Sequence, residues 1–432
     1  MAPSTPSSPL IELLQSVSSF SSIDFSRKLA RFEEAGFEST AEIDVFCGVW
    51  ETYCGELLHG SGDPGYLHPL ASLFQQSSNE EGRRRLIQRG LPSLRQLFES
   101  RCHIREGSSP DDWLFLLKIL VSLDHPQTGG QIVVDVIQSG FGGESFVWGV
   151  IFDIAIEDSE WSRFLQEKCA SNPPDLFCGI CFLDFSNHLA KTEGMSPHPF
   201  GTGSGLKLLQ EWLSSDDPGD ESYAMSAAET IQFLGGAEQR ELLDLAVTHD
   251  SEEVRLIVSE VLSNVDCERG TVLLRELCFN PATTRRAASR LRESGRENAI
   301  PAEINHPEFV ALSEFCEWLR DPENFGEIAD EIDCIGREKL YWPPTGDERE
   351  FFFFKYVYFS DCQEGNQPDE TGVGVVGSRT VSLVGHTNPS MSLREILALH
   401  CCWELQQQGD ARAPALLSVE EGERLLRVPP GN

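Results

Sequence analysis

The sequence predicts a mainly α-helical protein that ends in a small α+β domain. Helix start signals and helical apolar spacing recur between residues 10 and 300, and the apolar pattern changes to that of strands after residue 335. A helix–turn–helix arrangement also repeats in the middle of the chain. The sequence therefore divides into a disordered tail at 1–9, an irregular helical region at 10–200, a repetitive helical region at 205–334 and an α+β domain at 335–432.

The composition is that of a globular and strongly acidic protein. Of 432 residues, 40% are hydrophobic and 26 are phenylalanines, which is enough for sizeable cores. The formal net charge of −35 opposes binding to nucleic acid and to anionic membranes, because both require clustered positive charge. The 13 cysteines have no regular spacing, which favours a reducing cytoplasm over a secreted disulfide scaffold. We expect neither a signal peptide nor a membrane-spanning segment.

Capping residues set the expected helix boundaries in the first region. Asp158 precedes an apolar-periodic segment and is the expected cap of its helix. In "SNPPDLFCGICF" the expected cap is Asn172, and Pro173 and Pro174 open the helix. The glycine- and proline-rich segment 194–205 is expected to be a linker to the second region.

Three helix pairs follow one another in the second region. Each consists of a short apolar helix, a polar turn and a second helix, and the turn residues Asp216, Asp250 and Asn280 lie 34 and 30 residues apart. The second helices have helical apolar spacing. It is clearest in the series Val254, Ile257, Val258, Val261, Leu262 and Val265.

The segment "HDSEEVRLIVSEVL" resembles the turn and second helix of a HEAT-like, armadillo-type repeat. Asp250 corresponds to the aspartate of the family's turn, Val254 to its core valine and Arg255 to the arginine that follows. "FNPATTRRAASRL" is a looser match, in which Asn280 replaces the aspartate. The resemblance covers about residues 205–296 and implies a HEAT-like α-solenoid with an interaction surface. It implies no catalytic residue, although HEAT-like repeats also occur in enzymes of the phycobilin lyase type.

The last region changes from helical to strand periodicity. "EFFFFKYVYFS" is apolar on both faces and predicts a central strand. "TGVGVVGSRTVSLVG" predicts two strands around a turn at Gly377 and Ser378. Two helices follow, and their predicted capping boxes pair Ser392 with Glu395 in the first and Ser418 with Glu421 in the second. The adjacent cysteines 401 and 402 in the first of these helices are expected to be buried.

Two cysteines, Cys178 and Cys181, have the spacing of a redox dithiol or of half a zinc site. A redox dithiol needs its first cysteine at a helix N-terminus directly after a strand, whereas a loop precedes this helix. Zinc would need further ligands from loops, because His188 lies about 15 Å farther along the same helix. Together with Phe185 and Leu189 the two cysteines form one helical stripe, so we expect core packing, with metal binding or thiol chemistry as alternatives.

Two arginine-rich stretches interrupt the acidic background, at 83–105 and at 285–296. Arginine binds carboxylates in a bidentate manner, so these stretches are candidate sites for an acidic segment of a partner. The alternative is internal pairing with the abundant carboxylates. The partner-binding residues predicted on the second helices are Arg255, Arg285, Arg286, Arg290 and Arg292.

The sequence thus favours a cytoplasmic, non-catalytic scaffold that binds a protein partner through a helical-repeat surface. We expect no catalytic residues, no cofactor, and neither nucleic acid nor membrane among its partners. The alternative is an enzyme or a metal or thiol protein built on the same solenoid.

Overall fold

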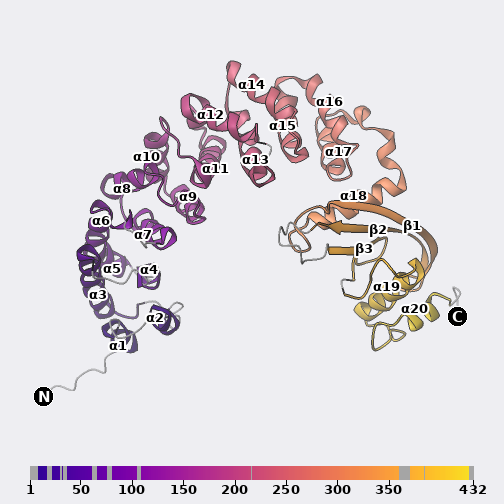
Figure 1. Ribbon diagram of the computed structural model, residues 1–432, viewed down its shortest axis with the longest axis horizontal. Coiled ribbons are helices and arrows are strands. Elements are labelled where there is room, and N and C mark those ends of the chain that lie inside the picture. Colours follow the sequence, from indigo (N-terminus) through magenta and orange to yellow (C-terminus); the bar gives the residue numbers. More distant parts are fainter. Residues whose placement is uncertain are drawn as a thin grey trace. The chain divides into compact units, whose positions relative to one another are not determined.

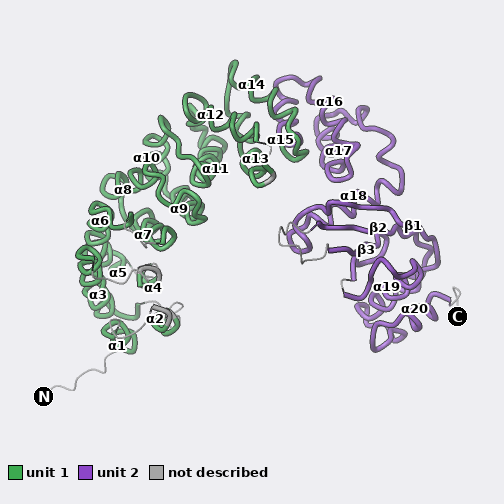
Figure 2. The backbone as a smooth tube through the Cα atoms, viewed as in Figure 1, with its two compact units in different colours: residues 1–254 green, residues 255–432 purple. Residues whose placement is uncertain are grey.

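The computed structural model of the chain describes residues 8–427, apart from 17–21, 30–31, 33–36, 61–65, 75–79, 105–108, 216, 360–369 and 384. The chain forms two compact units, residues 1–254 and 255–432 (Figure 2). Their border lies within helix α15 (Glu252–Val265). The domain borders that the sequence suggests elsewhere remain predictions. Most of the predicted tail lies outside the described residues, and the first helix already begins at Pro9.

Unit 1 consists of helices that pack against near neighbours in the chain. They are α1 (Pro9–Gln15), α2 (Ser22–Leu29), α3 (Thr40–His59), α4 (Leu67–Phe74), α5 (Glu80–Arg85), α6 (Leu91–Glu99), α7 (Pro110–Leu123), α8 (Pro126–Gln138), α9 (Val147–Glu157), α10 (Ser159–Cys169), α11 (Leu176–Glu193), α12 (Gly203–Trp212), α13 (Glu221–Thr230) and α14 (Gly236–Val247). Among the described residues, no helix is both long enough and apolar enough to span a membrane.

These helices lie in two layers. One layer contains α3, α6, α8, α10, α12 and α14, and the other contains α4, α7, α9, α11 and α13 (Figure 1). In the second layer every helix contacts the next one, from α4 to α7, α9, α11 and α13. Helix pairs such as α7 with α8 and α9 with α10 connect the layers. This arrangement, in which each helix is covered by its neighbours, is compatible with a helical repeat.

The predicted helix starts are confirmed at some positions and shifted at others. Asp158 caps α10 and accepts hydrogen bonds from the next helical N–H groups, as predicted. α11 begins at Leu176 with Asp175 as its cap, so the predicted start at Pro173 or Pro174 is wrong. The reason lies in the backbone, because Leu176 has a left-handed φ of 54° that separates the proline segment from the helix.

A π-helical turn at Leu86–Gly90 joins α5 and α6 into one continuous helical segment. Pro92 follows this turn and cannot donate a backbone hydrogen bond, which favours a local departure from α-helical bonding. The turn packs tightly on α3, because Trp50 donates its indole N–H to the carbonyl of Gly90 at 3.1 Å. A Cβ atom at Gly90 would lie 2.7 Å from the ring of Phe74, so only glycine allows this approach.

All three predicted helix pairs of the repetitive region are present. They are α12 with α13, α14 with α15, and α16 (Cys267–Leu277) with α17 (Thr284–Glu293). The predicted apolar stripe of α15 is buried at Val254, Val258 and Leu262, whereas Val265 at the helix end is 49% exposed. The turn residue Asp216 lies outside the described residues.

The segment 194–205 is not a loose linker. The ring of Phe200 is fully buried, and it lies 6.0 Å from the ring of Phe182 and 5.9 Å from that of Trp212. Gly205 packs so closely on this segment that a Cβ atom would lie 2.6 Å from the Cα of Phe200. The segment therefore belongs to the packed helical array, and its glycines serve close approach rather than flexibility.

Unit 2 continues with α16 and α17 and ends in a three-stranded antiparallel sheet with helices on both faces (Figure 1). Its remaining elements are α18 (Pro307–Arg320), β1 (Glu331–Trp342), β2 (Asp347–Tyr358), β3 (Glu370–Val376), α19 (Leu393–Gln408) and α20 (Val419–Leu426). The strand order is β1-β2-β3, so the prediction of a central strand at "EFFFFKYVYFS" is confirmed for its described part.

The phenylalanine run of β2 supplies two separate cores. Phe351 and Phe353 pack under α19 and α20 together with Cys401 and Cys402, which are buried as predicted. The alternate residues Phe352, Phe354 and Tyr356 pack under Phe315 and Leu319 of α18. The period-two alternation of a strand thus explains why this segment is apolar at every position.

Strand β1 begins before residue 335 and was not foreseen in the sequence. Its outer face is largely charged, and its register with β2 slips between Cys334 and Gly336. Cross-strand ion pairs join Arg337 to Glu350 and Lys339 to Glu348. Charged side chains of this kind are typical of an edge strand.

The second strand predicted after Gly377 is absent from the described residues 377–383. This segment forms a turn and bends, with an isolated bridge between Val376 and Ser378. The N–H of Val375 donates to the carbonyl of Val381 at 2.7 Å. The physical reason is a competing acceptor, because the carboxylate of Glu404 accepts hydrogen bonds from the hydroxyl of Ser378 and the N–H of Arg379. These bonds draw the chain from the sheet edge toward α19.

Candidate functional site

The predicted partner-binding arginines lie on two helices of unit 2. Arg255 is on α15, and the other four are on α17. Three of them form ion pairs with glutamates of neighbouring helices: Arg255 with Glu276, Arg285 with Glu317 and Arg290 with Glu260.

Burial divides these arginines into two kinds. The side chains of Arg255 and Arg290 are only 19% and 24% exposed, whereas that of Arg285 is 56% exposed. Arg286 donates to the carbonyl of Ala282 at 3.3 Å. The α17 surface is therefore a mosaic of arginines and glutamates, with less positive charge than its sequence suggests. Its role in binding a partner stays a prediction.

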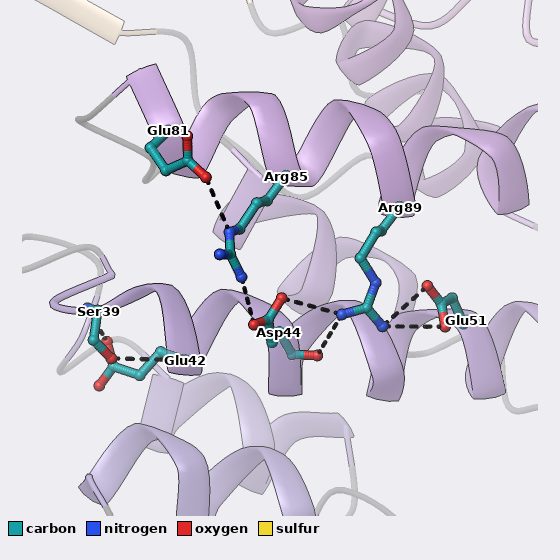
Figure 3. A network of polar contacts seen from close by, with 7 residues as sticks. All are labelled: Ser39, Glu42, Asp44, Glu51, Glu81, Arg85 and Arg89. Atoms are coloured by element: carbon teal, nitrogen blue, oxygen red, sulfur yellow. Dashed lines mark hydrogen bonds and ion pairs between the residues drawn. The ribbon is translucent and has the colours of Figure 1, made fainter.

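The first arginine-rich stretch forms an internal network between α3 and the helical segment around the π turn (Figure 3). Arg85 bridges Asp44 and Glu81, and Arg89 bridges Asp44 and Glu51. The Nη1 of Arg89 lies 3.2 Å from the Asp44 carboxylate. Since each arginine contacts two carboxylates, this network fastens α5 and the π turn to α3. Arg105, at the end of the same arginine-rich stretch, lies outside the described residues.

Arg95 forms a more deeply buried ion pair. Its Nε and Nη2 atoms donate to the two carboxylate oxygens of Asp124 at 2.6 and 2.7 Å. Only 4% of the Asp124 side chain is exposed, and the backbone N–H of His125 donates to the same carboxylate at 2.9 Å. This bidentate geometry fixes α6 to the turn between α7 and α8, because Asp124 is the C-cap residue of α7.

The candidate metal or redox cysteines lie in a closed environment. Because α11 begins at Leu176, Cys178 occupies its first turn, closer to the helix N-terminus than the sequence suggested. Burial nevertheless raises the pKa of Cys178 well above its ordinary value and raises the pKa of Cys181 to about 12. The backbone N–H of Cys178 donates to the carbonyl of Gly143 at 2.8 Å. Both side chains pack in the core, as the helical stripe predicted.

We expect the folded protein to protect these two thiols from alkylation near neutral pH. Thiolate is the reactive form, and burial disfavours it at Cys178 and Cys181, whereas Cys267 is exposed. Mass spectrometry after iodoacetamide treatment should show modification at Cys267 in the native state and at the other two only in denaturant. Replacing either buried cysteine by alanine should lower the free energy of unfolding by about 1 kcal/mol. Rapid native labelling of Cys178, or bound zinc that is lost in the double variant, would contradict core packing.

Among the described residues, no group of three or more histidine, cysteine or acidic side chains is arranged to hold a metal ion. Unit 2 does contain a buried polar network that sequence reasoning missed. The carboxylate of Glu404 accepts from the indole N–H of Trp342 at 2.9 Å and from the hydroxyl of Ser378 at 2.7 Å. The Nδ1 atom of His400 lies 3.0 Å from the same hydroxyl. The only signal in the sequence was a histidine four residues before a glutamate on an otherwise apolar helix.

In this network the carboxylate of Glu404 contacts the hydroxyl of Ser378, and the imidazole of His400 contacts that hydroxyl but not the carboxylate. Since Ser378 donates its single hydroxyl proton to Glu404, His400 must donate its Nδ1 proton to that oxygen. Burial lowers the pKa of His400 to about 3, so the imidazole is neutral at physiological pH. The hydroxyl therefore faces a carboxylate that also accepts from the N–H of Arg379 and the indole of Trp342, and this arrangement anchors the turn after β3 on α19.

Two open grooves in unit 1 share the C-terminal end of α8, where Gln138 and Ser139 line both. Their volumes are about 600 and 440 Å³. His103 lines the larger groove, and burial lowers its pKa. Ser204 and Lys207 of α12 line the smaller one. The grooves thus follow the helix ends, as clefts between successive helix pairs do.

Comparison with known proteins gives no relative: no protein-family model, no curated protein and no solved structure matches this chain. The likeness to HEAT repeats therefore depends on the segment around Asp250 and on the packing of successive helices.

Proposed function

We propose that this chain is a non-catalytic scaffold that binds another protein through the exposed faces of stacked HEAT-like helices. The observation that supports this function is the layer formed by α7, α9, α11 and α13, in which each helix packs on the next and leaves one stripe of side chains in solvent. Stripes on stacked helices join into one extended surface, which is how helical-repeat proteins bind their partners.

We also retain the α17 arginines as a proposed site for an acidic segment. Arg285 and Arg292 are exposed, and Arg290 lies at the border of solvent with Glu260 beside it. An acidic segment would compete with Glu260 and Glu317 for the guanidinium groups. Binding at this site should therefore weaken with salt, because exposed ion pairs are screened.

Exchanging the charges of the Arg290–Glu260 ion pair tests whether the α17 arginines bind a partner. We expect the variant with Arg286→Glu and Arg290→Glu to lose partners that full-length protein captures from native lysate. Adding Glu260→Arg should restore the ion pair, and with it up to about 1 kcal/mol of unfolding free energy, without restoring capture. Quantitative mass spectrometry of the captured proteins and thermal unfolding provide the two measurements.

Two outcomes would count against the proposals separately. Equal capture by the wild type and both variants would move the site away from α17. A wild-type protein that retains nothing beyond blank beads at physiological salt would contradict the scaffold function itself.

A further inference from the structure

A second exposed surface crosses the helix layer of unit 1. The N-cap residue Phe146 and the α9 residues Val150, Asp153 and Glu157 have the spacing of a single helical stripe, and all four are exposed. Matching stripes on the adjacent helices include Phe115 of α7, Asp184 of α11 and Glu229 of α13. We use the name α7–α13 face for the surface formed by Phe115, Phe146, Val150, Asp153, Asp184 and Glu229.

One half of the α7–α13 face is apolar. Phe146 is 59% exposed and Val150 is 36% exposed. The ring of Phe146 meets that of the half-buried Phe115 edge to face, with centroids 6.2 Å apart. Aromatic rings that remain in solvent next to aliphatic side chains are typical anchor points of protein interfaces.

The other half of the α7–α13 face is anionic, and the negative charge of one carboxylate affects the pKa of another. Burial is the main cause that raises the pKa of Cys181, and the negative charges of Asp184 and Asp153, from different helices, raise it further. The pKa of Asp184 is itself raised, mainly by burial and also by the negative charge of Glu229, while a hydrogen bond from Ser226 opposes this effect. Three exposed carboxylates thus come from α9, α11 and α13, which contact one another in this order.

These carboxylates differ from most of those described above. Within the part of the chain that the structure describes, Asp153, Asp184 and Glu229 form no ion pair, whereas Asp44, Asp124 and Glu260 each pair with an arginine. The lysines and arginines of α7, α9, α11 and α13 are only Lys118, whose Nζ lies 5.1 Å from the ring centroid of Phe115, and Lys191 toward the end of α11. The negative charge in the middle of the face is therefore uncompensated.

We propose that the α7–α13 face binds a basic segment of a partner protein that combines arginine or lysine with an apolar side chain. The apolar side chain covers Phe146 and Val150, and the cations approach Asp153, Asp184 and Glu229. Binding of this kind removes exposed apolar area from water and relieves the repulsion between the carboxylates. The inference rests on the proposed scaffold function and assigns a second partner chemistry, opposite in charge to that of the α17 arginines.

The probe for this face is a fluorescein-labelled peptide that repeats Leu-Lys-Arg-Lys, measured by fluorescence anisotropy with the full-length protein. A peptide with serine in place of leucine and an acidic peptide that repeats Leu-Glu-Asp-Glu are the comparison probes. We expect the basic, leucine-containing peptide to bind most tightly. The variant with Asp153→Asn, Asp184→Asn and Glu229→Gln should weaken this binding by at least about 10-fold, and Phe146→Ser should weaken it by about 3-fold or more.

A matched control separates the site from the overall charge. Glu167→Gln, Glu238→Gln and Glu241→Gln remove the same charge from α10 and α14 in the other layer, and this variant should retain binding within about 2-fold. All the substituted residues are exposed. Unchanged thermal unfolding therefore confirms that each variant is folded. Equal weakening by the two triple variants, or no effect of Phe146→Ser, would overturn the inference. Neither result bears on capture by the α17 arginines, so the scaffold function is tested independently.

Discussion

Arg95→Met should lower the free energy of unfolding of unit 1 by about 3–5 kcal/mol. Methionine preserves most of the apolar stem, but it leaves the carboxylate of Asp124 almost completely buried without its counter-charge. The remaining donor described for that carboxylate is the backbone N–H of His125. Denaturant titration of the full-length protein measures the loss, and hydrogen-exchange mass spectrometry locates it at α6 and α8.

Arg84→Met provides the matched control on the preceding turns of the same helical segment. Arg84 is 56% exposed and pairs with Glu80 and Glu81 at 3.5 and 3.1 Å, so its loss should cost no more than about 1 kcal/mol. Adding Asp124→Asn to Arg95→Met should recover part of the stability, because it removes the buried charge. Equal effects of the two arginine variants would show that burial does not strengthen the Arg95 pair.

Glu404→Gln should destabilise unit 2 by about 2–4 kcal/mol, although the shapes of the two side chains are nearly the same. The carboxylate accepts from Ser378 and Arg379 through one oxygen and from Trp342 through the other. An amide must place its NH2 group against one of these donors. The preferred orientation keeps the oxygen toward Ser378 and Arg379 and directs the NH2 group at the indole N–H.

A double-mutant cycle checks that assignment. Trp342→Phe removes the indole N–H, so Glu404→Gln should cost less in the Trp342→Phe background than in the wild type. The free energies come from denaturant unfolding of the four full-length proteins. Additive losses would contradict a direct bond between Trp342 and Glu404 as the source of the effect.

Local patterns in the sequence were sufficient to predict helices such as α10 and α15 and the central strand. The stripe around Val258 and the cap at Asp158 each depend on residues a few positions apart, so periodicity and capping chemistry predict them. β1 was missed because its edge position permits a charged outer face, which removes the apolar alternation that marks a half-buried strand. The strand expected after Gly377 fails for a non-local reason, since Glu404 supplies competing acceptors from a helix 26 residues farther along the chain.

The surfaces were harder to foresee than the elements. Clustered arginines such as Arg85 and Arg290 are visible in the sequence, but their partners Asp44 and Glu260 come from other helices and become apparent only in three dimensions. The residues of the α7–α13 face, in contrast, form no cluster in the sequence. They are scattered over four helices, and only the stacking of those helices places Asp153 near Asp184.

The packing of unit 1, in which helices such as α7, α9 and α11 cover their near neighbours in the chain, also determines how it melts. In such a linear array the free energy of unfolding is approximately the sum of the stabilities of the helix pairs and of their nearest-neighbour interfaces. Unfolding of one helix pair therefore affects its neighbours most, and the array does not have to unfold in a single cooperative step. Helix pairs at the N-terminal end can fray and close again while α9 and α11 stay folded. The middle of the array, where the α7–α13 face lies, therefore remains ordered under partial denaturation that has already opened the end.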